Sequence, residues 1–164
     1  MRIWPVALLL LAACSPGAGE SAQAAPPVGS TSTPAADIHP ESGLQVVPLT
    51  VTHGGKAHHF RVELARTGAE QAKGLMFRTA MGADEGMLFP FDPPRDASFW
   101  MKNTVIPLDI IFIGTDGRVL NINANAEPYS LEPRSSAGMV KAVLELNGGR
   151  AAALGIGPGA QVKW

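Results

Sequence analysis

The chain has 164 residues, a length that suits one domain with an appendage. Its formal net charge is −1, 16% of its residues are charged, and it contains no run of lysines and arginines. Proteins that bind nucleic acids usually carry clustered positive charge, so this composition argues against a nucleic-acid partner.

Residues 1–13 have the pattern of a lipoprotein signal peptide. Arg2 supplies a positive charge, and the apolar stretch that follows is shorter than the roughly 20 residues that span a bilayer. The stretch ends in Leu11-Ala12-Ala13-Cys14, which resembles the lipobox of bacterial lipoproteins. We therefore expect the protein to be exported and anchored to the membrane through lipid on Cys14. Ser15, in place of an aspartate, favours the outer membrane, with the protein facing the periplasm.

Cys14 is the only cysteine, which excludes an intramolecular disulfide, a cysteine-based zinc site and a cysteine nucleophile. Residues 14–43 are rich in Ala, Pro, Gly, Ser and Thr and show no apolar period. Such a segment buries too little apolar surface to fold, so we predict a disordered tether. Residues 44–164 are predicted to form a single globular domain.

A β-hairpin is predicted at the start of this domain. A two-residue turn at Gly54-Gly55 pairs His53 with Lys56, so that odd positions before the turn meet even positions after it. This register places six apolar residues on one face of the hairpin: Val47, Leu49, Val51, Phe60, Val62 and Leu64.

The rest of the domain shows short elements separated by turns. Thr67 and Glu70 have the spacing of a capping box, which predicts a helix to about Lys73 that stops at Gly74. Apolar runs predict strands at residues 86–91, 98–103, 108–113, 118–122, 140–146 and 161–164, with a turn at 92–96 and a helical turn at 149–154. This pattern predicts a mainly β fold, a small single-domain sandwich or barrel-like structure with one or two short helices.

Several stretches resemble one protein family in their order and spacing. They are Gly74–Arg78, Gly86–Phe89, Phe99–Thr104 with Ile106–Ile113, and Val143–Leu146 before Gly148-Gly149. They are similar to the family called domain of unknown function 192, over about Val62 to Val162. The resemblance implies a compact, mainly β domain that is often secreted or membrane-anchored, and it implies no established activity.

The segment from Trp100 to Thr104 provides the candidate ligand site. On an extended strand, Trp100 and Lys102 share one face with Thr104. An aromatic ring beside a lysine is an arrangement that binds sugars and aromatic or anionic ligands. Asp109 is predicted to accept a hydrogen bond from Lys102 or Asn103.

Arg78 is a second candidate donor to an anion. A purely structural interpretation of these residues stays open. In that interpretation Trp100 covers the core, Asn103 and Asp109 close turns, and Lys102 forms a surface ion pair with Asp109.

No catalytic residue, metal or other cofactor is predicted. His53 and His58 share a face of the hairpin but have no third ligand. Ser135 or Ser136 would make a catalytic arrangement with Lys102 only if the fold brought them together. Glu145 is predicted either to form a carboxylate pair with Asp109 or to face solvent.

The sequence thus leaves three functions open. The first is a lipid-anchored, non-catalytic module that binds a small molecule or saccharide around Arg78, Trp100, Lys102, Asn103 and Asp109. The second is an envelope scaffold or assembly factor that binds another protein through an exposed apolar patch. The third is a hydrolase of envelope material that depends on Lys102 or Ser136.

Overall fold

The computed structural model describes residues 37–164. The predicted signal peptide, the lipidation site at Cys14 and most of the predicted tether lie outside the described residues. The described end of that tether contacts the domain, because β1 (Asp37–Ile38) pairs antiparallel with the start of the hairpin. Within residues 37–164 no helix is both long and apolar enough to cross a membrane.

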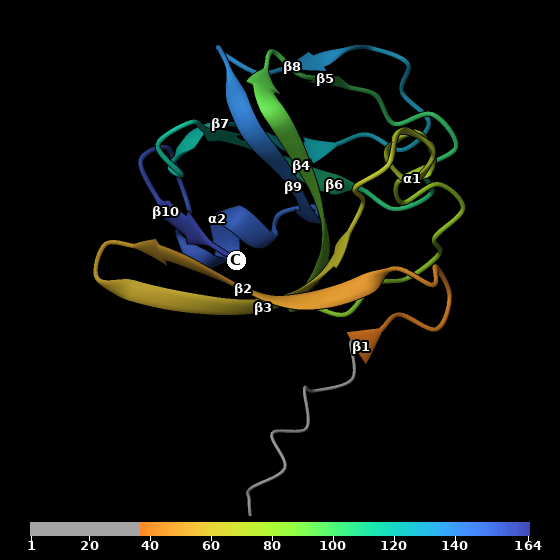
Figure 1. The fold of residues 1–164 in the computed structure, drawn as a ribbon, viewed down its shortest axis with the longest axis horizontal. Helices are drawn as coiled ribbons and strands as arrows, with labels where there is room; N and C mark the ends of the chain where they lie inside the picture. Colours follow the sequence, from red (N-terminus) through yellow and green to blue (C-terminus); the bar gives the residue numbers. More distant parts are fainter. Residues whose placement is uncertain (1–36) are drawn as a thin grey trace, which may run out of the picture. The chain divides into compact units, whose positions relative to one another are not determined.

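The fold is mainly β, as predicted, and is built on one strongly curved sheet (Figure 1). The strand order is β1-β2-β3-β4-β9-β6-β7, with β10 also paired to β2. The bounds of these strands are β2 Gln45–His53, β3 Lys56–Leu64, β4 Glu85–Arg95, β6 Leu108–Gly114, β7 Val119–Ala126, β9 Val140–Asn147 and β10 Gln161–Lys163. A hydrogen bond from the Val119 amide to the Ala160 carbonyl brings β7 near β10, but the sheet is not a closed barrel.

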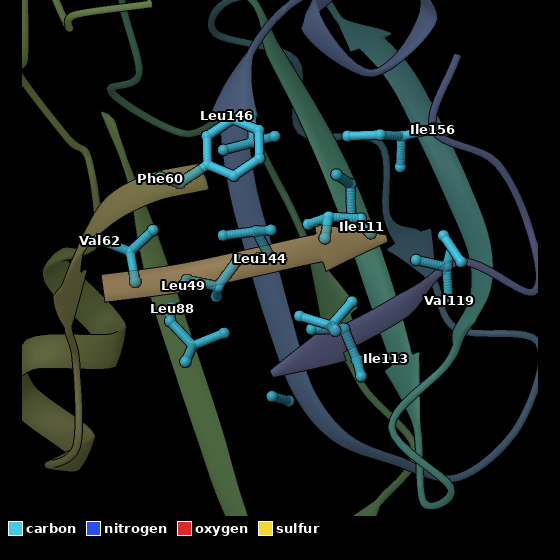
Figure 2. Close-up of a cluster of buried hydrophobic side chains, with 14 of the residues drawn as sticks. Leu49, Phe60, Val62, Leu88, Ile111, Ile113, Val119, Leu144, Leu146 and Ile156 are labelled. Atoms are coloured by element: carbon cyan, nitrogen blue, oxygen red, sulfur yellow. The ribbon is translucent and has the colours of Figure 1, made fainter. Parts of the chain in front are cut away.

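The predicted hairpin is confirmed in its register. His53 lies opposite Lys56, and Leu49 lies opposite Phe60. The apolar face of the hairpin packs into a first core, whose side chains converge from both halves of the curved sheet (Figure 2). Helix α2 (Arg150–Leu154), near the predicted helical turn, contributes Ala151 and Leu154 to this core.

Helix α1 (Gly68–Lys73) is the predicted capped helix. The Thr67 hydroxyl accepts a hydrogen bond from the Glu70 amide, and the Glu70 carboxylate accepts one from the Thr67 amide, which completes the capping box. The helix stands in the connection between β3 and β4, and these strands are parallel, so the chain must cross over between them.

A second core lies on the opposite face of the central strands. It contains Met87 and Phe89 of β4, Ile110 and Phe112 of β6, and Val143 of β9. The loop after β5 (Ser98–Phe99) adds Met101, which is completely buried. β5 pairs with β8 (Arg134–Ser135) in a separate two-stranded sheet.

Two predicted elements differ in the structure. The segment 92–96 is not a simple turn, because β4 continues to Arg95 through an irregularity in its pairing with β9. The strand predicted at 98–103 ends at Phe99, and the chain then turns, with Asn103 in the left-handed region at φ +56°.

Candidate functional site

A cavity of about 410 Å³ lies between α1, the loop that follows β5, and the face of β4 and β9 that carries the second core. Phe89 and Phe91 line it from the sheet, and Trp100 and Lys102 line it from the loop. Its remaining lining comes from Gly68, Gln71, Ala72, Lys73, Gly74, Leu75, Met76, Arg95, Ser98, Phe99, Thr104 and Glu145.

The structure brings Trp100 and Lys102 together, although not by the predicted alternation. Because the strand ends at Phe99, Trp100 is 51% exposed whereas Thr104 is buried, so the prediction that these two share a face with Lys102 along one strand is wrong. The Lys102 ammonium group nevertheless lies 5.1 Å from the centre of the Trp100 ring, within cation–π distance.

The charges that line the cavity are mostly positive. Lys73 comes from α1, Arg95 from the end of β4, and Lys102 from the loop. The Arg95 guanidinium lies 4.3 Å from the centre of the Phe91 ring, which gives a second pair of cation and aromatic ring. Glu145 is the one acidic side chain in the lining.

Glu145 is buried at the inner end of this site, on β9. It lies opposite Met87 of β4 and Ile110 of β6, and both of these belong to the second core. Only 5% of the residue is exposed, and within residues 37–164 its carboxyl group makes no side-chain hydrogen bond and no ion pair. Burial raises the pKa of this carboxyl group to about 8, so the group is mostly protonated at neutral pH.

Asp109 lies outside the cavity and has a structural role. Its carboxylate is fully buried and accepts hydrogen bonds from the backbone amides of Asn125, Gly149 and Ala151, at 2.7, 2.9 and 2.7 Å. The predicted bonds to Lys102 and Asn103 are not formed. Asp109 lies opposite Leu146 of the first core, whereas Glu145 faces the second core, so the two carboxyl groups point to opposite faces of the sheet and the predicted carboxylate pair is wrong. The alternative prediction, that Glu145 faces solvent, is also wrong because Glu145 is buried.

Arg78 is also absent from the cavity lining. Its guanidinium donates to both carboxylate oxygens of Glu63, and its Nε lies 3.0 Å from Glu41. Burial alone would lower the pKa of Arg78, but the hydrogen bond to Glu63 and the charges of Glu63, Glu41 and Glu85 raise it overall. These carboxylates compensate its charge, which leaves little attraction for an external anion.

Asn103 lies next to the cavity without lining it. Its amide nitrogen lies 3.8 Å from the Met76 sulfur, and its carbonyl accepts a hydrogen bond from the Phe77 amide. Asn103 therefore connects the loop that carries Trp100 and Lys102 to the segment after α1.

The residues of the other predicted sites are separate from the cavity. The Ser136 hydroxyl accepts a hydrogen bond from the Ala97 amide, and the Ser135 hydroxyl bonds to Ser98. Neither serine lines the cavity with Lys102. In the described part of the chain, no three His, Cys, Asp or Glu side chains are grouped as a metal site would require.

Three charged residues of the cavity, Lys73, Arg95 and Glu145, are absent from the site predicted from the sequence, and only Glu145 has a signal there. It interrupts an apolar run, Val143-Leu144-Glu145-Leu146, on a strand that has neighbours on both sides. A charged residue in the middle of such a run is the signal that would have marked it as buried.

Comparison with known proteins places the chain among uncharacterised relatives. A family model described as DUF192, Uncharacterized ACR, matches residues 49–164. No curated protein matches the chain. A protein of unknown function from Novosphingobium aromaticivorans DSM 12444, known from a crystal structure, is 58% identical in sequence to this chain. The match covers 91% of this chain and 100% of that protein, with a TM-score of 0.78. A proposed transcription regulator from Sinorhizobium meliloti 1021 is 40% identical, covers 73% of this chain and 94% of its own, and has a TM-score of 0.71.

Proposed function

The chain belongs to the DUF192 family, and we propose that this member is a lipid-anchored, non-catalytic module that binds a small anionic ligand in the cavity beside Trp100. The anchor is the lipid expected on Cys14, and the proposed location is the periplasmic side of the outer membrane. The role of transcription regulator proposed for the Sinorhizobium protein is not extended to this chain, whose net charge is −1.

The observation that carries this proposal is the pairing of cations with aromatic rings in one cavity. Lys102 lies over Trp100 and Arg95 lies over Phe91, and both pairs line the same space. An aromatic ring, or the C–H face of a sugar ring, can stack on the exposed Trp100 while a charged substituent of that ring meets Lys102 or Arg95. Acidic saccharides have both features, as do carboxylated aromatic molecules.

The cavity offers little for hydrolysis. Glycoside hydrolysis ordinarily requires two carboxyl groups on either side of the bond that is cleaved, and Glu145 is the single carboxyl group in this lining. Thr104 is buried, and its hydroxyl donates to the backbone carbonyl of Lys102. These features favour binding over catalysis.

The test is calorimetric titration of the full chain in detergent with N-acetylmuramic acid and with N-acetylglucosamine. The two sugars share the ring and the acetamido group, and only the first carries a carboxylate. We expect the acidic sugar to bind more tightly, and Lys102→Met to remove that difference. Lys141→Met is the matched control, because Lys141 lies 5.0 Å from the Trp164 ring, outside the cavity.

A ligand present at about 100 times its dissociation constant stabilises a protein by roughly 2.7 kcal/mol, so binding also raises the unfolding temperature. Recovery of the unchanged sugar after long incubation separates binding from hydrolysis. If neither these sugars nor a wider panel of carboxylated sugars and aromatic acids binds, the proposed function is wrong.

A second candidate function, an envelope scaffold, is favoured by a different observation. Phe77, Tyr129 and Leu131 are each more than three-fifths exposed, and they lie on loops that backbone hydrogen bonds connect to the Trp100 loop. The Phe77 amide donates to Asn103, and the Tyr129 amide donates to Thr104. Exposed apolar side chains gathered in this way are typical of protein-binding surfaces.

The scaffold hypothesis predicts that a protein is cross-linked to this surface in intact cells. Replacing Tyr129 and Leu131 by lysine should abolish that cross-link without changing the binding of N-acetylmuramic acid. An unchanged cross-linking pattern in this double variant would argue against a scaffold role.

A further inference from the structure

Glu145 is a buried carboxyl group that the structure leaves without a partner. Other buried acidic groups of this domain are compensated: Glu63 by Arg78, and Asp109 by three backbone amides. Glu145 is 5% exposed, lines the cavity, and has no hydrogen-bonding partner for its side chain within residues 37–164. The carboxyl oxygens are not among the fully enclosed side-chain atoms that lack a partner in the described residues, so they are reached from the cavity, where a ligand can bind to them.

We propose that the Glu145 carboxyl group determines ligand specificity by donating a hydrogen bond to an acceptor oxygen at the inner end of an anionic ligand. This inference rests on the proposed function and defines its ligand class more closely. The ligand would carry its negative charge toward Lys102 and Arg95, its ring against Trp100, and a carbonyl or ether oxygen toward Glu145.

Three cationic side chains line the same cavity as Glu145 and by themselves would favour its ionised form, so it is burial that raises its pKa and keeps the group protonated. Lys73 faces the cavity from α1, Arg95 from β4 and Lys102 from the loop after β5, while β6 contributes Ile110, and Asp109 lies on the other face of the sheet. No second acidic group lines the cavity. Since burial raises the pKa of Glu145 to about 8, its proton is available below that pH and is lost above it.

An ionised Glu145 has no proton to donate to the carbonyl or ether oxygen and repels the ligand's lone pairs and negative charge, whereas the protonated group can donate. Ligand affinity should therefore fall as Glu145 ionises. A glutamine at this position keeps a donor and never ionises, whereas a methionine has a similar size and no donor.

The experiment compares wild type, Glu145→Gln, Glu145→Met and Lys102→Met by calorimetric titration with N-acetylmuramic acid at about pH 6 and about pH 9. At the lower pH we expect Glu145→Gln to bind within a few-fold of wild type, and Glu145→Met to bind about tenfold more weakly or worse. Raising the pH should weaken wild type more than Glu145→Gln.

Thermal unfolding checks that each variant is folded. Glu145→Met replaces an uncompensated polar group in an apolar core, so we expect it to be at least as stable as wild type. A loss of affinity in this folded variant would then be due to the missing hydrogen-bond donor and not to unfolding.

The outcomes separate this inference from the proposed function. If Glu145→Met binds as tightly as wild type while Lys102→Met does not, the role of Glu145 is wrong and the anion-binding function stands. The same conclusion follows if wild type and Glu145→Gln weaken equally as the pH rises. If wild type binds neither the acidic sugar nor the wider panel of carboxylated ligands, both proposals are wrong.

Discussion

The Arg78 guanidinium binds both carboxylate oxygens of Glu63, with nitrogen–oxygen distances of 2.8 and 3.1 Å, and both residues are buried. The Arg78 Nε also lies 3.0 Å from Glu41, in the turn between β1 and β2. One arginine therefore connects three segments: the N-terminal turn, β3 and the loop after α1. Arg78 therefore has a structural role, whereas the sequence predicted that it would donate hydrogen bonds to an anionic ligand.

Replacing Arg78 by methionine should lower the free energy of unfolding by about 3–5 kcal/mol, because Glu63 is left buried with an uncompensated charge. Urea unfolding of the two proteins measures the difference. The control is Arg61→Met, which removes a pair with Asp37 in which both side chains are more than half exposed, and which we expect to change stability by less than about 1 kcal/mol. Equal effects of the two substitutions would contradict this assignment.

Asp109 should be nearly as important for stability. Asp109→Ala leaves the buried amide of Ala151 and the partly buried amide bonds of Asn125 and Gly149 without their acceptor, and we expect a loss of about 3 kcal/mol. Asp109→Asn keeps one acceptor oxygen and should lose less. Hydrogen exchange of the Ala151 amide provides a local measurement, since its protection should fall in both variants. Full retention of protection in Asp109→Ala would show that the carboxylate does not hold the start of α2.

The elements predicted correctly have signals that are local in the sequence. The Gly54-Gly55 turn determines which residues of β2 and β3 face each other, and the Thr67 capping box forms within a single turn of helix. Residues Ile110 to Ile113 are apolar on both faces, which predicts a central strand, and β6 is buried along its whole length between β7 and β9.

The candidate site was predicted less well because it depends on contacts between distant segments. Trp100 and Lys102 do meet, but through a turn at a left-handed Asn103 that no alternation pattern reveals. Arg78 lies in the connection that runs from β3 through α1 to the parallel strand β4, and this crossover brings it to Glu63 of β3. Local sequence does not specify which strand β4 pairs with. The importance of Glu145 follows from β9 being covered on both faces.

Phe77 should be replaceable without loss of stability. It is 65% exposed and adopts φ +64°, a conformation that is unfavourable for a bulky residue and tolerated by asparagine. We expect Phe77→Asn to change the free energy of unfolding by no more than about 0.5 kcal/mol, or to raise it. Leu75→Ala, in the same segment but at a buried position, should cost about 2–5 kcal/mol. A large loss in Phe77→Asn would mean that the exposed ring has a structural role.

The pH dependence of folding should reveal Glu145 without any ligand. Its pKa is raised from 4.5 to about 8 in the folded protein, so the folded state holds a proton that the unfolded state releases. Below about pH 4.5 both states are protonated and the group has no effect on stability. Between about pH 4.5 and 8 stability falls as the pH rises, and above about pH 8 the loss is complete.

The magnitude follows from the same shift. A difference of 8 − 4.5 = 3.5 pH units, at about 1.4 kcal/mol per unit, gives a loss on the order of 5 kcal/mol across this range. Glu145→Gln cannot ionise, so its stability relative to wild type should increase steadily from about pH 5 to about pH 8. Urea unfolding at a series of pH values measures this difference, with Glu132→Gln as the control, because the Glu132 side chain is 74% exposed. If wild type and Glu145→Gln showed parallel pH profiles, Glu145 would have to be ionised in the folded protein, and it would have no proton to donate to a ligand.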